Sequence, residues 1–477
     1  MTYWITAAGM KLFGVNAFGA RFFLQLAYLF QIILVYKIGR NLFQSKEKAL
    51  YAALFYAGLP LVLMSVRNLT TDAYLNTFEL LGVYLLIRYY RHRKPLWLYL
   101  FFTDLALALF TKGPVGLLIP LLMVYPVRKI TDISDNKNTM HVWLGTLLML
   151  ALGSSWFFYL MLKSPAFYHF FVDVQLGDRI FKASSLHRAK PFWYYLAFFP
   201  ATTLPAFLFI PEAIGKGFKQ KNRPVLLLTL YWLIIPFLFF SVSSSKLVLY
   251  VLPLSPYVAL AAGWLLDEKP FGKLKTWYFV FWGFYLLILA ALTTLFLGAV
   301  PTVPYKPDTA AVLFLISGIL AMIYFLFRKN KLHLALMSLI LPLILVPVST
   351  DILHQMEGEA NGMMPVAGFL KKQHLDSRKI LVWDKRLPSL SFDLQKDIYS
   401  IYHVDFSLKR HTEFQENQNW KKNLINVNHP EELAYLQKLA ATPSVLLVKK
   451  GKLPQKFMFF TRSYPHHKTM GKWEIYY

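Results

Sequence analysis

The sequence of 477 residues contains no cysteine and has a small share of charged residues. Without cysteine, a disulfide framework, a thiolate nucleophile and a cysteine-ligated metal are all excluded. Charged residues make up 16% of the chain, whereas soluble domains have about 25%. The segment Thr2 to Gly14 does not predict a secretory signal peptide, because no basic stretch precedes an apolar core there. These deficits exclude a disordered chain, a collagen-like fibre and an ordinary cytosolic enzyme.

Hydrophobic residues make up 56% of the chain and aromatic residues 17%, and the mean hydropathy is +0.42. A run of roughly 17–25 apolar residues is long enough to cross a bilayer as a helix. About twelve such runs lie near residues 20–38, 49–65, 72–90, 96–111, 114–127, 141–162, 192–211, 225–241, 247–266, 276–299, 309–327 and 332–348. We therefore predict a polytopic α-helical membrane protein with about twelve transmembrane helices.

Lysine and arginine gather in alternate loops between these runs. The basic loops lie near residues 37–48, 88–94, 128–137, 216–223, 269–275 and 328–331. Short loops rich in Lys and Arg stay in the cytoplasm. The formal net charge of +26 is therefore explained mainly by membrane orientation and contact with lipid headgroups. No nucleic-acid partner is predicted. The chain is expected to be integral to a bacterial plasma (inner) membrane, with everything after about Thr350 outside the cytoplasm. An even number of helices also places the start outside, which suggests that a first helix precedes Met1.

The last part of the chain differs in composition from the rest. Charges of both signs return, and short apolar runs at 380–383 and 444–448 predict buried strands, while 364–374 and 430–440 predict helices. We therefore predict a transmembrane domain over residues 1–349 and a small exterior α/β domain over residues 350–477, with a recognition or packing role. The pair His466-His467 fits a metal site or a surface loop, and the loop is favoured because no further ligand can be placed.

Ionisable residues near membrane helices are costly and therefore informative. Asp72 lies where a helix is expected to begin, so its carboxylate serves either as an N-cap or as a functional acid. Lys112 precedes Gly113-Pro114 and either grips a phosphate or anchors the helix end by snorkelling. Asp104 lies nearer the middle of its helix and must be paired or protonated, and the sequence names no certain partner.

Two further exterior segments carry cations beside aromatic residues. The long loop between Lys163 and Lys190 contains Arg179, whose guanidinium suits a phosphate. Lys246 and Tyr250 are four residues apart and share a face if that segment is helical. Singly, each basic residue is better explained as an interface anchor, but together they place cations and an acid around an exterior cavity beside lipid.

Five short motifs, in this order, resemble the C-type glycosyltransferases, closest to the branch with protein O-mannosyltransferases and the bacterial aminoarabinose transferase of lipid A. The motifs are Gly9-Met-Lys-Leu-Phe-Gly14 followed by Ala20-Arg21, Arg67 with Asp72, Thr111-Lys-Gly-Pro114, Arg179 through His187 to Pro191-Phe-Trp-Tyr-Tyr195, and Ser245-Lys246 with Tyr250-Val-Leu-Pro253. The resemblance covers most of the chain, including the exterior α/β tail.

This resemblance implies an inverting transfer of a sugar from a polyprenyl-phosphate donor to an envelope acceptor at the outer face of the membrane. It implies Asp72 as a catalytic residue, matching the second of the family's two exterior acids, with basic residues holding the lipid phosphate. The implied substrate-binding residues are Arg67, Lys112, Arg179, Lys246 and Tyr250. The implied partners are the polyprenyl-phosphate-linked sugar, a lipid or protein acceptor, and membrane lipids.

The chain departs from this family at its start, because a first helix and an exterior loop with the primary acid would precede Met1. A transporter or lipid flippase, or a noncatalytic remnant of the family, therefore stay as alternatives, although no internal repeat of the kind found in transporters is evident. No cofactor is assigned; a divalent metal stays open, because metal use varies in the family. The sugar and the acceptor are also left open.

Overall fold

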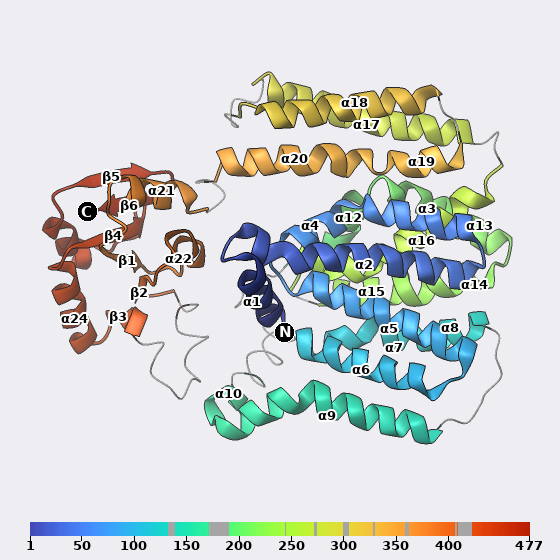
Figure 1. The fold of residues 1–477 in the computed structure, drawn as a ribbon, viewed down its shortest axis with the longest axis horizontal. Helices are drawn as coiled ribbons and strands as arrows, with labels where there is room; N and C mark the ends of the chain where they lie inside the picture. Colours follow the sequence, from blue (N-terminus) through green and yellow to red (C-terminus); the bar gives the residue numbers. More distant parts are fainter. Residues whose placement is uncertain are drawn as a thin grey trace. The chain divides into compact units, whose positions relative to one another are not determined.

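The computed structural model describes residues 1–131, 139–169, 171, 190–243, 245–270, 274–298, 305–327, 330–357, 362–405, 408 and 422–477. The chain divides into two compact units. The first unit comprises Met1–Leu160 and Val172–Val348, and the second comprises Met161–Phe171 and Ser349–Tyr477. The described part of the first unit is helical, and many of its helices run alongside one another (Figure 1).

The helices before the first gap in the description are α1 (Thr2–Phe13), α2 (Ala17–Phe43), α3 (Lys46–Ala57), α4 (Pro60–Arg67), α5 (Asp72–His92), α6 (Pro95–Lys112), the 3-10 helix η1 (Gly113–Leu117), α7 (Leu118–Leu122) and α8 (Val124–Thr131). They are followed by α9 (Thr139–Lys163), α10 (Pro165–His169), α12 (Tyr194–Thr202), η4 (Ala206–Phe209), α13 (Ile210–Lys219), α14 (Arg223–Leu228), the π-helical turn η5 (Thr229–Ile234) and α15 (Ile235–Val242). The remaining ones are η6 (Val248–Leu254), α16 (Ser255–Glu268), α17 (Leu274–Phe296), α18 (Thr309–Phe327), α19 (Lys331–Met337) and α20 (Ile340–Gln355).

Each of the apolar runs in the sequence coincides with helical structure, but the number of spans depends on how breaks are counted. Seven described helical segments are long and apolar enough to cross a membrane, and nine if each of two bent pairs is one span. The expected spans 96–111 and 114–127 fall within one of the seven, Pro95–Thr131, and α18 counts only as a shorter apolar helix. The span expected at 72–90 is α5, which carries Asp72, Glu79 and Arg88.

Bends in the helices follow from local sequence. Between α3 and α4 the direction changes by 56°, where Gly58 and Leu59 precede Pro60 at the first position of α4. The span expected at 192–211 is instead a pair of short helical segments that meet at 108°. At the end of α6, Gly113 takes φ +77°, a conformation open mainly to glycine. The chain turns there, and Asp104 of α6 and Pro120 of α7 both lie close to Gly82 of α5.

Helix α16 is buried along nearly its whole length and packs closely on α3. A Cβ atom at Gly263 would lie 2.5 Å from the backbone nitrogen of Ala52, so the absence of a side chain allows this approach.

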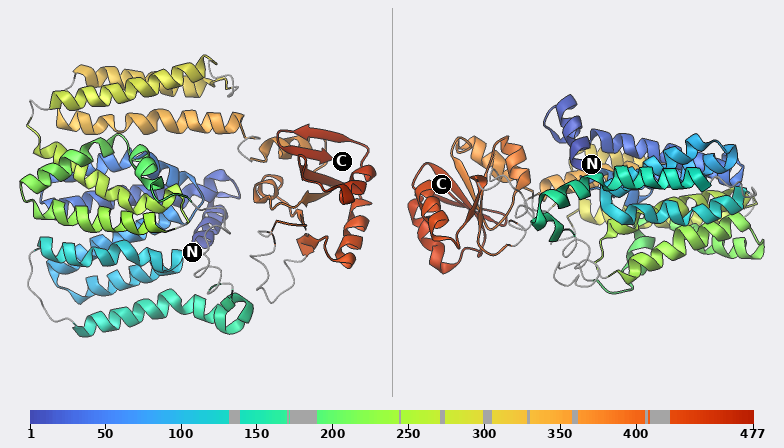
Figure 2. Two further views of the ribbon diagram at one scale, coloured as in Figure 1. Left: turned by 180° about the vertical axis from the view of Figure 1, so that it is seen from behind. Right: turned by 90° about the horizontal axis from the view of Figure 1, so that it is seen from below.

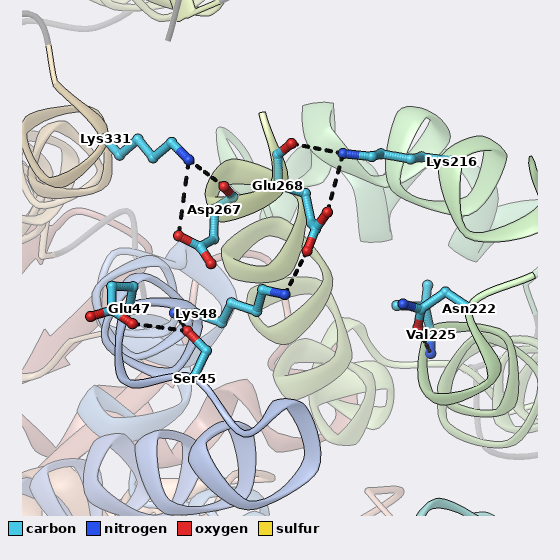
Figure 3. A network of polar contacts seen from close by, with 9 residues as sticks. All are labelled: Ser45, Glu47, Lys48, Lys216, Asn222, Val225, Asp267, Glu268 and Lys331. Atoms are coloured by element: carbon cyan, nitrogen blue, oxygen red, sulfur yellow. Dashed lines mark hydrogen bonds and ion pairs between the residues drawn. The ribbon is translucent and has the colours of Figure 1, made fainter. Parts of the chain in front are cut away.

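Lysines from three other elements surround the C-terminal end of α16 (Figure 3). Lys48 Nζ lies 2.6 Å from Glu268 Oε1, and Lys216 Nζ lies 2.8 Å from the backbone oxygen of Glu268. Lys331 Nζ donates to the backbone oxygen of Asp267 and lies 4.0 Å from its carboxylate. Cations are favourable at the negative end of a helix dipole, so these contacts stabilise the end of the most buried helix.

The second unit contains a six-stranded sheet with the strand order β3-β2-β1-β4-β6-β5. Its elements are α21 (Met364–Lys372), β1 (Lys379–Trp383), α22 (Pro388–Leu394), β2 (Tyr399–Tyr402), β3 (Leu424–Asn426), α24 (Pro430–Ala440), β4 (Ser444–Lys449), the 3-10 helix η9 (Gln455–Ser463), β5 (His467–Met470) and β6 (Trp473–Tyr476). Strands β1 to β4 pair in parallel, and β6 pairs antiparallel with both β4 and β5. Helices α21 and α22 cover one face and α24 the other (Figure 2).

The helices and strands predicted for the C-terminal part are confirmed. The runs 380–383 and 444–448 lie in β1 and β4, and the predicted helices correspond to α21 and α24. His467 is the first residue of β5, with its ring stacked on Tyr476, and His466 directly precedes the strand. Among the described residues, no group of three or more His, Cys, Asp or Glu side chains is placed to hold a metal ion.

Candidate active site

A cavity of about 670 Å³ lies within the first unit, bounded by α5, α6, η1, α15 and η6. Its wall is mostly apolar, with side chains such as Leu75, Val115, Phe239 and Leu252. The polar side chains on the wall are Asp72, Glu79, Lys112, Ser243, Ser245 and Tyr250. Large apolar pockets with a few convergent polar groups are typical of ligand sites, and here the polar groups come from segments far apart in the sequence.

Asp72 and Lys112 form an ion pair at this wall. Asp72 is the first residue of α5, and Lys112 is the last residue of α6. The N-cap of α5 is Thr71, without a side-chain capping bond, so Asp72 is not the N-cap of the helix. Side-chain exposures of 11% for Asp72 and 19% for Lys112 show that the pair is largely shielded from solvent. The Lys112 ammonium is therefore directed at a carboxylate on the cavity wall rather than snorkelling away from the helix end.

Tyr250 completes this cluster from a third element. The Lys112 Nζ atom lies over the Tyr250 ring, 4.6 Å from its centroid, in the range of a cation–π contact. The sequence motifs that hold Asp72, Lys112 and Tyr250 are thus brought together in one place. An ammonium has three donor hydrogens, so Lys112 can bind a second anion while it stays paired with Asp72.

A buried network of amide and hydroxyl groups fixes the first turns of α5. Gln31 Nε2 of α2 donates to the backbone oxygen of Ala73 and to Thr77 Oγ1, at 2.8 Å each. Tyr56 of α3 donates to Gln31 Oε1 at 2.7 Å and accepts from Asn76 Nδ2 at 2.8 Å. Satisfied buried networks of this kind rigidify the elements that they join. The backbone that carries Asp72 is therefore held by two neighbouring helices, α2 and α3.

Two hydrogen bonds hold η6, which carries Tyr250. The hydroxyl of Tyr195 in α12 donates to the backbone oxygen of Leu247 at 3.0 Å. Trp232 Nε1 donates to the backbone oxygen of Pro253 at 2.9 Å. Trp232 lies in the π-helical turn η5, and such turns occur frequently at functional sites. Both ends of η6 are thus tied to neighbouring helices.

The other predicted site residues do not line the cavity in the described part of the chain. Lys246 precedes η6, so it does not share a helical face with Tyr250; its buried ammonium donates to the backbone oxygens of Ser243, at 2.5 Å, and Lys190, at 3.2 Å. Burial lowers the pKa of Lys246. Arg67 ends α4 and is exposed. Arg179 lies outside the described residues.

Two buried acids accompany the cluster. Glu79 of α5 is only 2% exposed and lines the cavity, although the motif analysis did not select it. A signal was available, because Glu79 follows Asp72 by seven residues, or two helical turns, within an apolar run. Asp104 of α6 is 3% exposed and does not line the cavity. Neither carboxylate oxygen of Asp104 has a hydrogen-bond partner among the described residues, so the structure supplies no partner for it there.

Comparisons with known proteins find similarity to glycosyltransferases. Residues 1–159 match the family described as dolichyl-phosphate-mannose-protein mannosyltransferase. Over 322 residues the chain is 30% identical to the undecaprenyl phosphate-α-4-amino-4-deoxy-L-arabinose arabinosyl transferase of Aeromonas salmonicida, covering 65% of this chain and 58% of that protein. It is also 29% identical over 309 residues to an uncharacterized protein of Aquifex aeolicus, covering 64% of this chain and 60% of that one.

A solved structure shares the fold over the whole chain. The crystal structure of ArnT from Cupriavidus metallidurans bound to undecaprenyl phosphate matches with a TM-score of 0.74 and 18% identity, covering 100% of this chain and 87% of that one. The predicted fold class, a helical membrane protein with a small C-terminal α/β domain, is confirmed. The chain spans 60% or less of the length of these curated relatives.

Proposed function

We propose that the chain is an inverting glycosyltransferase. It is similar in sequence and in fold to the C-type glycosyltransferases, in the branch with protein O-mannosyltransferases and lipid A aminoarabinose transferases. The donor is a sugar on a polyprenyl phosphate, and the acceptor is a lipid, glycan or protein of the envelope. The observation that carries the proposal is the Asp72–Lys112–Tyr250 cluster on the wall of a large apolar cavity. An anionic lipid with a long hydrocarbon tail is complementary to such a site.

The chemistry assigns a task to each member of the cluster. The acceptor oxygen forms a bond to the anomeric carbon, while the bond from that carbon to the phosphate oxygen breaks on the opposite side and leaves its electron pair on the phosphate. Lys112 stabilises the negative charge that develops on the leaving phosphate. When the acceptor is a hydroxyl, Asp72 takes its proton as general base. Tyr250 holds the Lys112 ammonium beside the phosphate through its ring.

The binding of the donor would also change the ion pair. In the structure Lys112 is paired with Asp72, so an arriving phosphate would share the ammonium with the carboxylate. The carboxylate is then held less tightly by Lys112 and is free to contact the acceptor. Arg67, Arg179 and Lys246 are retained in the proposal as cations for the phosphate or the headgroup of the acceptor.

The relative positions of the cavity and the lysine cluster support a membrane orientation. Helix η6 lines the cavity and runs directly into α16, whose far end is held by Lys48, Lys216 and Lys331. The 14 residues of α16 separate these two sites by about 21 Å. If the basic end is cytoplasmic, the cavity faces the outer leaflet. We propose an inner-membrane protein with the transferase domain over residues 1–349 and an exterior domain over residues 350–477.

Transfer from a lipid-linked sugar to an endogenous acceptor in membranes tests this function. Asp72→Asn and Lys112→Met are each expected to lower turnover at least about a hundredfold, because each removes a charge that acts in the transition state. Asp376→Asn, in the second unit, is the matched control. Unchanged turnover in Asp72→Asn at equal expression would overturn the assignment of Asp72, and uptake of the lipid without glycosylated product would favour a transporter.

A further inference from the structure

Glu79 is a charged side chain of the cavity that the proposed chemistry does not use. Its side chain lines the same cavity as Asp72 and Lys112, yet the residue is only 2% exposed. The Oε2 atom has no hydrogen-bond partner among the described residues. A buried carboxylate oxygen without a hydrogen-bond partner raises the free energy of the folded protein. A group that enters the cavity and donates a hydrogen bond to Glu79 would remove most of this penalty.

The charges around the cavity are unbalanced. Glu79 lies within Coulombic range of two other acids, Asp72 and Asp104, and of one cation, Lys112. Lys112 forms its ion pair with Asp72, and the Oε2 atom of Glu79 has no hydrogen-bond partner in the described part of the chain. A ligand that reaches Glu79 must therefore offer hydrogen-bond donors rather than another anion.

The spacing along α5 separates the two acids of the cavity wall. Glu79 follows Asp72 by seven residues, which places their backbone positions on one helical face about 10.5 Å apart along the axis. Two turns of the helix therefore leave room along the wall for one end of a sugar at Asp72 and the other at Glu79. A donor whose anomeric carbon is beside Asp72 and Lys112 would place the far side of its ring beside Glu79.

We propose that Glu79 recognises the donor sugar, by accepting a hydrogen bond from a hydroxyl or amino group on the side of the ring away from the phosphate. The inference rests on the proposed function, because it assumes that the phosphate lies at Lys112. Two turns of α5 then have different roles. The first turn, with Asp72, contacts the reacting end of the donor, and the third turn, with Glu79, selects the sugar.

Binding of lipids with and without a sugar separates this inference from the proposed function. The probes are undecaprenyl phosphate, undecaprenyl phosphate-α-4-amino-4-deoxy-L-arabinose and undecaprenyl phosphate-mannose, each competed against a fluorescent polyprenyl phosphate on the purified full chain. The unmodified protein is expected to bind one sugar-bearing lipid more tightly than the bare lipid. Glu79→Leu should reduce that advantage about tenfold or more and leave affinity for the bare lipid unchanged.

Matched variants keep the result interpretable. Glu79→Gln retains the size of the side chain and an acceptor oxygen. This variant is measured in place of Glu79→Leu if Glu79→Leu does not fold. Asp104→Asn changes a buried acid that does not line the cavity and should leave the sugar advantage unchanged. An undiminished sugar advantage in both Glu79 variants, or no sugar advantage in the unmodified protein, would overturn the role of Glu79 while the proposed function stands. Failure to bind any polyprenyl phosphate would overturn both.

Discussion

At the residue scale, the cation that faces the cavity is held from two sides by groups of different chemistry. Asp72 contacts the Lys112 ammonium through an ion pair, and Tyr250 contacts it through its ring face. The ring holds the charge in place without neutralising it, whereas a second carboxylate would lower its attraction for a phosphate. The arrangement keeps a cation available to an incoming anion in a mostly apolar space.

Substitution of Tyr250 tests this division. Tyr250→Phe keeps the aromatic face and is expected to retain transfer activity within about threefold. Tyr250→Leu removes a cation–π contact worth about 0.5–2 kcal/mol and should raise the KM for the lipid donor by roughly twofold to thirtyfold. Donor titrations of both variants in membranes measure the difference. Equal losses in the two variants would assign the role to the Tyr250 hydroxyl instead of the ring.

The sequence predicted some of the site residues and missed others for physical reasons. Asp72 and Lys112 lie at helix ends, where a charge is conspicuous, and Tyr250 lies in a short motif with Lys246. Glu79 lies inside an apolar run, and only the i, i+7 relation to Asp72 points to it. The carbonyl partners of Lys246 could not be predicted, because they depend on how the backbone at Ser243 and Lys190 folds.

At the element scale, α5 is the helix on which the site depends, and its position is set by polar contacts inside the helical unit. The amide of Gln31 and the hydroxyl of Tyr56 join α2 and α3 to the first two turns of α5. Interhelical hydrogen bonds are a common way to fix helices in a membrane, where apolar contacts with lipid and with protein are alike. The network therefore gives α5 a defined register.

Removal of one hydroxyl from this network should destabilise the unit measurably. Tyr56→Phe leaves Asn76 and Gln31 without their shared partner and is expected to cost about 1–3 kcal/mol. Thermal unfolding of the detergent-solubilised protein should show a lower Tm. Tyr51→Phe is the matched control, since Tyr51 lies on the same helix, is also buried, and has no hydrogen bond through its hydroxyl among the described residues. A Tm drop of equal size in the control would contradict the role of the network.

Helix positions were predictable, whereas helix directions were not. Every expected apolar run is helical because hydrophobic length is a strong signal. The bend of 108° between α12 and α13 divides a run that reads as one continuous span. Pro200 and Pro205 in this run mark a break, but the angle at the break also depends on packing against neighbouring helices.

At the scale of the whole molecule, two units with different chemistry share one chain. The first is a set of largely apolar helices, and the second is a twisted sheet with helices on both faces. Strands β1 and β4 were predictable because their side chains are almost all buried. Strand β5 at the edge has exposed residues and no apolar run, so hydrophobic patterning could not reveal it.

The absence of cysteine makes the proposed orientation directly testable. A single cysteine introduced into this chain is its only thiol. Gln220→Cys, at an exposed position in the first unit after α13, and Gln373→Cys, at an exposed position after α21, form a matched pair. In spheroplasts, a membrane-impermeant thiol reagent is expected to label Gln373→Cys and to spare Gln220→Cys until the membrane is opened. The reverse pattern would place the C-terminal domain in the cytoplasm.

The cavity has charged groups at one part of a largely hydrocarbon-like wall, and this contrast acts as a filter on solubility. A water-soluble nucleotide sugar would have to lose bound water along its whole length to enter the cavity, and only its phosphates would find charged partners there. A molecule with an apolar tail and an ionic headgroup loses little bound water on entry. The site would thus sort sugars by the physical state of their carrier before it reads the sugar itself, and the large pool of activated sugars dissolved in water would not compete for it.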